Sequence, residues 1–440
     1  MGYIVELSNE GGGYLVLGME DKLPHTVVGS NFSAGKIGKL EDAVYTELAI
    51  RVHITELFDA ANKRVVVTKI PSRPKGRTLK FEGVPLMRTG DSLRNMSDDE
   101  LFTILSEQEQ DFSATICNTL TLEDLDAKAI EVMKSRYAEK QNNPTFSSQS
   151  DEQALIDLDL IQNNKLTYAA LILLGKKEKI KALLPQCAVH LEYRSNEASI
   201  QYDKRDRFQE PYFILIEEAW KIIDARNKQK HIQVGSFISD IHSLNNEVIR
   251  ESVNNAVAHR DYTKASEIVI KQSPTLFQVT SHGGFPLGVS RDNILSVNST
   301  PRNRLLSEVL TKTGFVERSG QGVDKIFYQS LSEGKGFPTY EDSDLFQVSI
   351  KIPLVILFPV FTLFIKEIQN ELGEGEKLGA QHLITLVKIR DGIALNEIDK
   401  SSLNKLEEAN AIKQTSSDVM LSKKYTALVE QHEGSDLDKL

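Results

Sequence analysis

The sequence has few cysteines, the residues that form disulfide bonds in small secreted domains and hold many structural metals. Among its 440 residues are two cysteines, Cys117 and Cys187, 13 prolines and a single tryptophan. The two cysteines form neither a metal-binding spacing nor a disulfide framework, so we expect a reducing, cytoplasmic environment. The N-terminal residues lack a basic segment followed by an apolar core, so we expect no signal peptide.

Long apolar runs and a P-loop are also lacking. The longest apolar run, residues 355–365, is too short to span a bilayer and contains Pro359, so we expect no membrane segment. The triple glycine at residues 11–13 is not followed by Gly-Lys-Ser/Thr, which excludes a P-loop at that point. We see no internal repeat and no low-complexity tract, and the length predicts two to four domains.

An excess of positive charge is absent as well. The formal net charge is −10, which argues against broad, non-specific coating of nucleic acid. One stretch differs, because it holds six basic residues with no acid between them. These residues, the candidates for nucleic-acid binding, are Arg64, Lys69, Arg73, Lys75, Arg77 and Lys80. The stretch is either a solvated loop or a phosphate-contacting surface, and the sequence leaves both open.

The most informative stretch is residues 250–262, which the spacing of Val253, Ala256 and Val257 predicts to be a helix. Glu251 and Asn255 lie four apart and so share one helix face. An amide oxygen there can complete the shell of a Mg²⁺ ion that bridges nucleotide phosphates. The carboxylate one turn away can orient or deprotonate the attacking water. The alternative is an ordinary solvated Glu–Asn pair.

These residues resemble the N-box of the GHKL ATPases, the gyrase, heat-shock chaperone, histidine kinase and MutL type. The ending His-Arg-Asp-Tyr at 259–262 more narrowly resembles bacterial ATP-binding regulators labelled "RecG-like". Three further blocks follow in the family's order, at residues 281–286, 299–303 and 317–322. The resemblance implies ATP and Mg²⁺ as cofactors, with Glu251 as the catalytic base and Asn255 as the metal ligand. The expected nucleotide-binding residues are Asn255, His259, Asp261, Thr280, Gly283, Gly284, Arg302, Asn303, Arg318, Gly320 and Gly322.

Glycines suit two of these blocks because backbone N–H groups can approach phosphate where no Cβ intervenes. The helix expected after Gly322 would add the partial positive charge of its N-terminus. One departure concerns adenine recognition. GHKL enzymes place an aspartate before the glycines of the second block, whereas this sequence has Thr280-Ser281-His282. A hydroxyl, a backbone group or water must then replace the acid, and the identity of the nucleotide stays open.

The N-terminal region resembles a Schlafen-type AlbA-like domain, through its Asn9-to-Gly13 turn, a Leu-x-Leu-Gly strand and an Arg-x-Gly turn at 88–90. Family members carry an acidic strand and a helix before the glycine turn, so this domain is expected to be shortened. In relatives with nuclease activity that portion helps to hold the metal, so we expect no nuclease activity. The tail reads as helix, helix and two short strands, the order of a winged helix.

The predicted fold class is therefore α+β and multidomain. The expected parts are an AlbA-like domain (1–110), a helical connector and linker (111–152), a middle region packing on the ATPase (153–235), a GHKL or Bergerat-type sandwich (236–355) and a winged-helix-like tail (373–440). The expected function is an ATP-binding, DNA-associated regulator switched by Mg-ATP, with slow hydrolysis left open and a homo-oligomer not excluded. The alternatives are a defence-type effector acting on nucleic acid and a non-hydrolysing, nucleotide-dependent interaction protein.

Overall fold

The computed structural model describes most of the chain. The described residues are 1–90, 92–105, 107, 111–197, 199, 201–234, 237–286, 288–297, 301–316, 322–393, 400–415 and 418–432. They form two compact units. The first comprises residues 1–110 with the short segments 283–288 and 343–348, and the second comprises the remainder.

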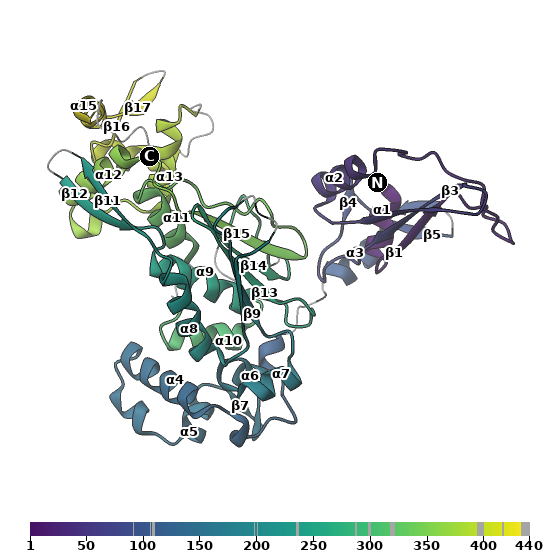
Figure 1. Ribbon diagram of the computed structural model, residues 1–440, viewed down its shortest axis with the longest axis horizontal. Coiled ribbons are helices and arrows are strands. Elements are labelled where there is room, and N and C mark those ends of the chain that lie inside the picture. Colours follow the sequence, from purple (N-terminus) through teal and green to yellow (C-terminus); the bar gives the residue numbers. More distant parts are fainter. Residues whose placement is uncertain are drawn as a thin grey trace. The chain divides into compact units, whose positions relative to one another are not determined.

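The first unit is built on two small antiparallel sheets and three helices (Figure 1). The first sheet has the order β1-β3-β2 and the second the order β4-β5-β6. The strands are β1 Gly13–Leu17, β2 His53–Phe58, β3 Arg64–Ile70, β4 Lys80–Phe81, β5 Val84–Thr89 and β6 Ser92–Asn95. The helices are α1 Gly2–Asn9, α2 Ile37–Leu48 and α3 Asp98–Leu105.

Local signals predict several of these elements. Strand β3 spans the residues that the apolar run at 64–70 predicts. Helix α3 begins at the expected capping box, since Ser97 N donates to Glu100 Oε2 (2.9 Å) and Glu100 N to Ser97 Oγ (3.3 Å). Helix α1 was not predicted. Its last residue, Asn9, holds the unit together, because its side chain bonds the backbone of Leu79 and Leu86.

The second unit begins with a helical part. Its elements are η1 Phe112–Ala114, η2 Leu122–Asp124, α4 Ala127–Lys140, η3 Pro144–Ser148, α5 Asp151–Asp157, β7 Ile161–Gln162, β8 Lys165–Leu166, α6 Tyr168–Leu174 and α7 Lys177–Leu183. The polar stretch 139–152 is not the open linker that its composition predicts. Phe146 is 1% exposed and its ring stacks on Tyr137, with ring centroids 3.9 Å apart. A single well-placed aromatic side chain therefore anchors the stretch.

A five-stranded sheet follows, with the order β10-β9-β13-β14-β15 (Figure 1). Its strands are β9 Val189–Tyr193, β10 Lys204–Phe208, β13 Ile268–Gln272, β14 Leu276–His282 and β15 Gln347–Pro353. Strands β9 and β13 run parallel, and β13 and β14 form the hairpin that the turn at Ser273-Pro274 predicts. The helices around the sheet are α8 Tyr212–Asp224, α9 Asn246–His259, α10 Arg304–Lys312 and α11 Gly322–Ser332. A shared apolar core joins α8, α9 and α10 to the sheet and to the helical part.

A second core packs against α11. It is formed by α12 Pro359–Glu371, α13 Ala380–Arg390, α14 Lys400–Glu408, β16 Ile412–Gln414, β17 Val419–Leu421 and α15 Lys423–His432. The other elements are η4 Glu374–Glu376 and the hairpin β11 Gln229–Val234 and β12 Phe237–His242, whose Ile241 packs in a small separate cluster with Ile356 and Leu363. The order of α13, α14, β16 and β17 is the one expected for the tail, and α15 adds a further helix that was not predicted. None of the helices in the described ranges has the length and apolar character needed to cross a membrane.

Candidate nucleotide site on helix α9

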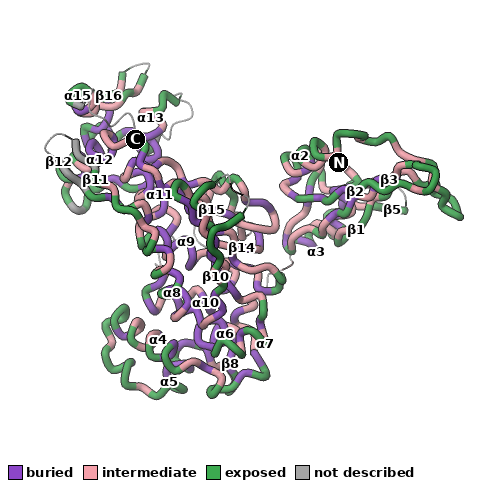
Figure 2. Tube along the Cα trace, viewed as in Figure 1, coloured by how far each residue is buried: buried purple, intermediate pink, exposed green. Residues whose placement is uncertain are grey.

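Helix α9 is held by a polar cap at one end and by an apolar face along its length. Asn245 is the N-cap, and its Oδ1 accepts from the backbone N–H of Glu247 at 2.9 Å. Val253, Ala256 and Val257 are buried and share an apolar core with the sheet. Figure 2 marks most of α9 as buried. Because this apolar face fixes the rotation of the helix, the side chains of Glu251 and Asn255 are fixed with it.

Glu251 and Asn255 meet as their spacing predicts. Asn255 Nδ2 donates to Glu251 Oε1 at 3.1 Å, and Glu251 is 7% exposed. Within the part of the chain that the structure describes, Asn255 Oδ1 accepts no hydrogen bond. A buried carboxylate beside an amide differs from the solvated pair that is the ordinary interpretation of this spacing. The carbonyl end of Asn255 remains available as an oxygen ligand.

The neighbouring asparagine has a different role, which the sequence did not reveal. Asn254 is fully buried, accepts a hydrogen bond from Tyr212 Oη and donates to the carbonyl of Phe315. Burial is the main reason that the pKa of Tyr212 is raised, and the charge of Glu251 raises it further. Asn254 therefore joins α9 to α8 and to the chain after α10.

The first turn of α11 lies against Glu251. A Cβ built on Gly322 would come within 1.7 Å of Glu251 Oε1, so only glycine leaves room for the carboxylate. The N-terminus of a helix favours a negative charge nearby. Two blocks far apart in the sequence therefore meet at one carboxylate. Arg318 and Gly320, also predicted to bind nucleotide, lie outside the described residues.

In the block before Gly283, the hydroxyl on the side of α9 belongs to Ser281, whereas Thr280 was the predicted nucleotide-binding residue. Side chains of β14 alternate, so that Phe277, Val279 and Ser281 are buried while Thr280 is only partly buried. Phe277 and Val279 share the apolar core with α9, whereas Thr280 Oγ1 bonds Ser349 Oγ at 2.9 Å. Period-two alternation therefore places Ser281, not Thr280, on the face that α9 covers.

Backbone conformation and close backbone contacts explain why residues 283 and 284 are glycines. Gly283 has φ +100°, and its N–H donates to the carbonyl of Phe346 at 2.7 Å. A Cβ on Gly284 would lie 2.3 Å from the carbonyl oxygen of Leu345. Packing within the first unit accounts for both glycines, so their presence is not by itself a sign of phosphate binding.

At the C-terminal end of α9, backbone carbonyls accept hydrogen bonds from residues that were predicted to bind nucleotide. Asn303 Nδ2 donates to the carbonyls of Ala258 (3.0 Å) and Arg260 (2.7 Å), and Arg302 NH1 donates to the carbonyl of His259 (2.8 Å). The carboxylate of Asp261 accepts from the backbone and hydroxyl of Thr263 in a local turn. These groups have structural partners that the sequence motif did not indicate.

His259 is electrostatically suited to remain neutral. Burial, and secondarily the charge of Arg302, lowers its pKa to about 4. At neutral pH the imidazole therefore carries no charge, and it could meet a nucleotide only as a neutral hydrogen-bonding group.

The residues fit the demands of a Mg²⁺ ion bound together with a nucleotide. Among the residues whose placement is described, no group of three or more His, Cys, Asp or Glu side chains could hold a metal. A free-standing metal site is thus not formed there. Mg²⁺ that is held mostly by phosphates and water needs only one protein oxygen, and Asn255 Oδ1 can supply it.

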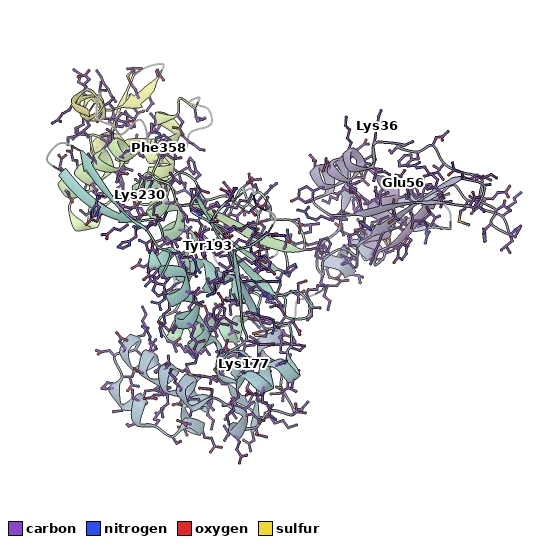
Figure 3. The ribbon with its side chains drawn as sticks, in the orientation of Figure 1. Lys36, Glu56, Lys177, Tyr193, Lys230 and Phe358 are labelled. Atoms are coloured by element: carbon purple, nitrogen blue, oxygen red, sulfur yellow. The ribbon has the colours of Figure 1, made fainter. Side chains whose placement is uncertain are left out.

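The six basic residues of the 64–80 stretch separate into two groups. Its three arginines form contacts within the first unit, and none of the three is exposed. Arg64 pairs with Glu56, which Figure 3 labels, and Arg73 forms two bonds to Glu107 (2.8 and 2.7 Å). Arg77 NH2 donates to the carbonyl of Pro286 at 2.7 Å. By contrast, Lys69, Lys75 and Lys80 are exposed.

Comparisons with known proteins agree with part of this picture. Residues 266–350 match the HATPase_c_4 family, described as "Putative ATP-dependent DNA helicase recG C-terminal". Residues 102–190 match a "Domain of unknown function (DUF8451)". No curated protein matches the chain.

The fold is similar to that of a solved structure, the DIP2311 protein from Corynebacterium diphtheriae. The two chains are 18% identical, with a TM-score of 0.61, and the match covers 97% of this chain and 87% of the other. At this identity the likeness shows a shared fold and nothing about activity. The chain therefore contains an ATPase-like segment within an α+β, multidomain fold.

Proposed function

We propose that the chain binds Mg-ATP beside the face of α9 that carries Glu251 and Asn255, and that binding switches the conformation of a DNA-associated regulator. The observation that carries the proposal is the meeting of Glu251, Asn255 and Gly322. A buried carboxylate, an amide oxygen and the start of a helix are the groups that a bound triphosphate, its metal and an attacking water require.

In this proposal each residue has a separate task. Asn255 Oδ1 would hold the ion, which would neutralise charge on the phosphates. Glu251 would accept a proton from water, and its position is fixed by Asn255 on one side and Gly322 on the other. Ser281 replaces Thr280 as the candidate hydroxyl for the base of the nucleotide, because it lies on the α9 side of β14.

Replacing Glu251 by glutamine should separate binding from hydrolysis. The amide keeps the size and a hydrogen-bonding oxygen but cannot accept the proton of water. We expect ATP affinity within a few-fold of wild type and a loss of turnover of about 10²-fold or more, the usual contribution of a general base. Phosphate release and calorimetry on the same samples measure the two effects.

The matched control is Glu247→Gln, one turn earlier on α9, where the side chain is 77% exposed. It should retain the turnover of the wild type. Equal turnover in Glu251→Gln and wild type, or no turnover in wild type, would show that Glu251 is not a general base.

A second candidate function is nucleic-acid binding by the first unit, favoured by the exposure of Lys69, Lys75 and Lys80. Replacing all three by glutamine should weaken binding to duplex DNA and flatten its salt dependence. Each lysine that no longer neutralises a phosphate lowers the logarithmic salt slope by about 0.9. Fluorescence anisotropy at several salt concentrations measures the slope.

Arg73 and Arg77 are kept in this variant, because replacing either would also remove hydrogen bonds that hold the unit together. The control replaces three exposed lysines of the second unit, Lys128, Lys181 and Lys228, by glutamine. It changes the net charge equally. If both triple variants are weakened to the same degree, or if deleting residues 373–440 removes binding instead, the lysines of the first unit are not the contact surface.

A further inference from the structure

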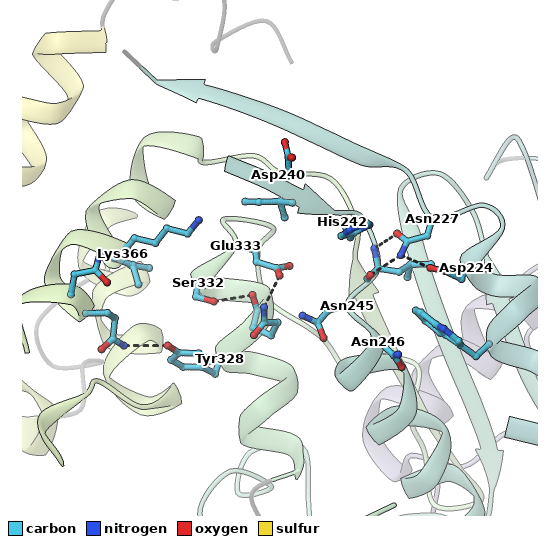
Figure 4. Close-up of a pocket in the computed structure, with 17 residues that line it drawn as sticks. Asp224, Asn227, Asp240, His242, Asn245, Asn246, Tyr328, Ser332, Glu333 and Lys366 are labelled. Carbon is cyan, nitrogen blue, oxygen red and sulfur yellow. Dashed lines mark hydrogen bonds between the residues drawn. The ribbon is translucent and has the colours of Figure 1, made fainter. Parts of the chain in front are cut away.

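A separate cavity of about 590 Å³ lies within the second unit (Figure 4). Its walls come from the end of α8, the strand β12, the first turn of α9, the last turns of α11 and one face of α12. Neither Glu251 nor Asn255 lines it. The volume is within the range of small-molecule sites, about 300–1,000 Å³, and is far larger than a single ion needs.

The charge of the lining is negative. Asp224 on α8, Asp240 on β12 and Glu333 after α11 supply three carboxylates, and Lys366 on α12 supplies one ammonium group. Glu333 is already neutralised by the buried Lys335, whose Nζ also donates to the carbonyls of His242 (2.7 Å) and Ser243 (3.0 Å). The charges that can act on a ligand are therefore those of the two aspartates and of Lys366, whose sum is negative, so the cavity disfavours a second nucleotide.

Both aspartates have only weak partners. Asp224 Oδ1 accepts a hydrogen bond from Asn227 Nδ2 at 3.0 Å, and Asp240 pairs with His231, whose side chain is 73% exposed. Exposed pairs of this kind contribute little and are readily exchanged. In Figure 4, Asp224 and Asp240 lie apart on the cavity wall instead of converging on one point. In agreement, no metal-binding group is found among the described residues.

The rest of the wall suits a chain of methylene groups. Ile241, Leu244 and Ile365 line the cavity, and the aromatic rings of Trp220 and Tyr328 come from different helices. Aromatic faces attract ammonium groups, and the amide oxygens of asparagine side chains accept their hydrogen bonds. A ligand that satisfies this wall carries positive charges separated by apolar spacers.

We propose that this cavity binds a linear organic polycation of the polyamine class. Separate ammonium groups would reach Asp224 and Asp240, and the methylene spacers would cover the aliphatic side chains between them. Because the first turn of α9 and the last turns of α11 form part of the wall, the ligand would contact both helices that carry Glu251 and Gly322. Binding itself requires no nucleotide.

Trp220 is the only tryptophan of the chain and lines the cavity, so its fluorescence reports occupancy directly. Titrating the full chain with spermidine should give a saturable change. The double variant Asp224→Asn/Asp240→Asn should lose at least tenfold in affinity. Both side chains are exposed and asparagine keeps an acceptor oxygen, so the variant should fold with an unchanged melting temperature.

The control Asp21→Asn/Glu47→Gln removes two exposed carboxylates of the first unit and should bind spermidine as the wild type does. The neutral diol 1,8-octanediol should leave the fluorescence unchanged. If both double variants lose the same spermidine affinity, the binding reflects only general attraction to an acidic chain, and the proposal is overturned. So would the absence of a saturable change, or equal binding of the diol.

The variant Asn255→Ala should titrate with spermidine like wild type. Failure of the nucleotide proposal would therefore leave this result intact. Failure of the spermidine titration would likewise leave ATP binding untouched.

Discussion

Replacing Asn255 by alanine is expected to lower the affinity for Mg-ATP at least a hundredfold, to below detection by calorimetry. The amide would supply the one protein oxygen to the ion, and its Nδ2 holds Glu251 at 3.1 Å. The loss should depend on the metal. With EDTA in place of Mg²⁺, wild type and variant should bind ATP with the same low affinity.

Asn246→Ala is the control for this experiment, because Asn246 is an exposed asparagine in the first turn of the same helix. It should leave Mg-ATP affinity unchanged. If Asn255→Ala binds Mg-ATP as tightly as wild type, the metal role of Asn255 is wrong. If it binds more weakly to the same degree with and without Mg²⁺, the side chain contacts the nucleotide without the ion.

Replacing Gly322 by alanine is expected to abolish hydrolysis although residue 322 carries no functional group. The added methyl group would lie 1.7 Å from Glu251 Oε1, so the carboxylate or the first turn of α11 must shift. Overpacking of this kind typically costs about 1–3 kcal/mol of stability. Turnover should fall as far as in Glu251→Gln, and urea unfolding should show the loss of stability.

Two further variants isolate the cause. Gly38→Ala places the same methyl group in helix α2, where nothing lies within 4 Å, and should not destabilise the chain. Combining Gly322→Ala with Glu251→Asp, whose side chain is one methylene shorter, should recover part of the lost stability. If Gly322→Ala is as stable and as active as wild type, the close contact between α11 and Glu251 does not exist in solution.

Local patterns account for many individual elements. The apolar run at 64–70 and the Ser97 capping box predicted β3 and the start of α3, and the alternating residues around Ser273-Pro274 predicted the hairpin of β13 and β14. These signals succeed because they depend on neighbouring residues alone. For residues 139–152 the same reasoning predicted an open linker, which is wrong. The buried ring of Phe146 anchors this stretch although its composition is polar.

Two details of the candidate site show where local reasoning stops. The sequence places Glu251 and Asn255 on one face, but nothing in it reveals that the neighbouring Asn254 is buried in the core and links two other elements. Similarly, Thr280 and Ser281 are both hydroxyls at the expected place, and only the packing of β14 on α9 decides which one faces the helix. Burial is a property of the neighbours in space, so a motif cannot supply it.

The sequence by itself indicated a helix in residues 250–262, its i, i+4 pair, and the order of the blocks that resemble an ATPase. These follow from residue spacing and from backbone preferences that act within a few residues. In the structure the helix spans Asn246–His259, so it begins one turn earlier and ends before Arg260. Only the tertiary structure decided that Gly322 lies against Glu251, that Arg73 and Arg77 bond residues distant in the chain, and that five separate elements, α9 and α11 among them, line a cavity. Each of these depends on contacts between residues far apart in the chain, which exist only once the apolar cores have brought the elements together.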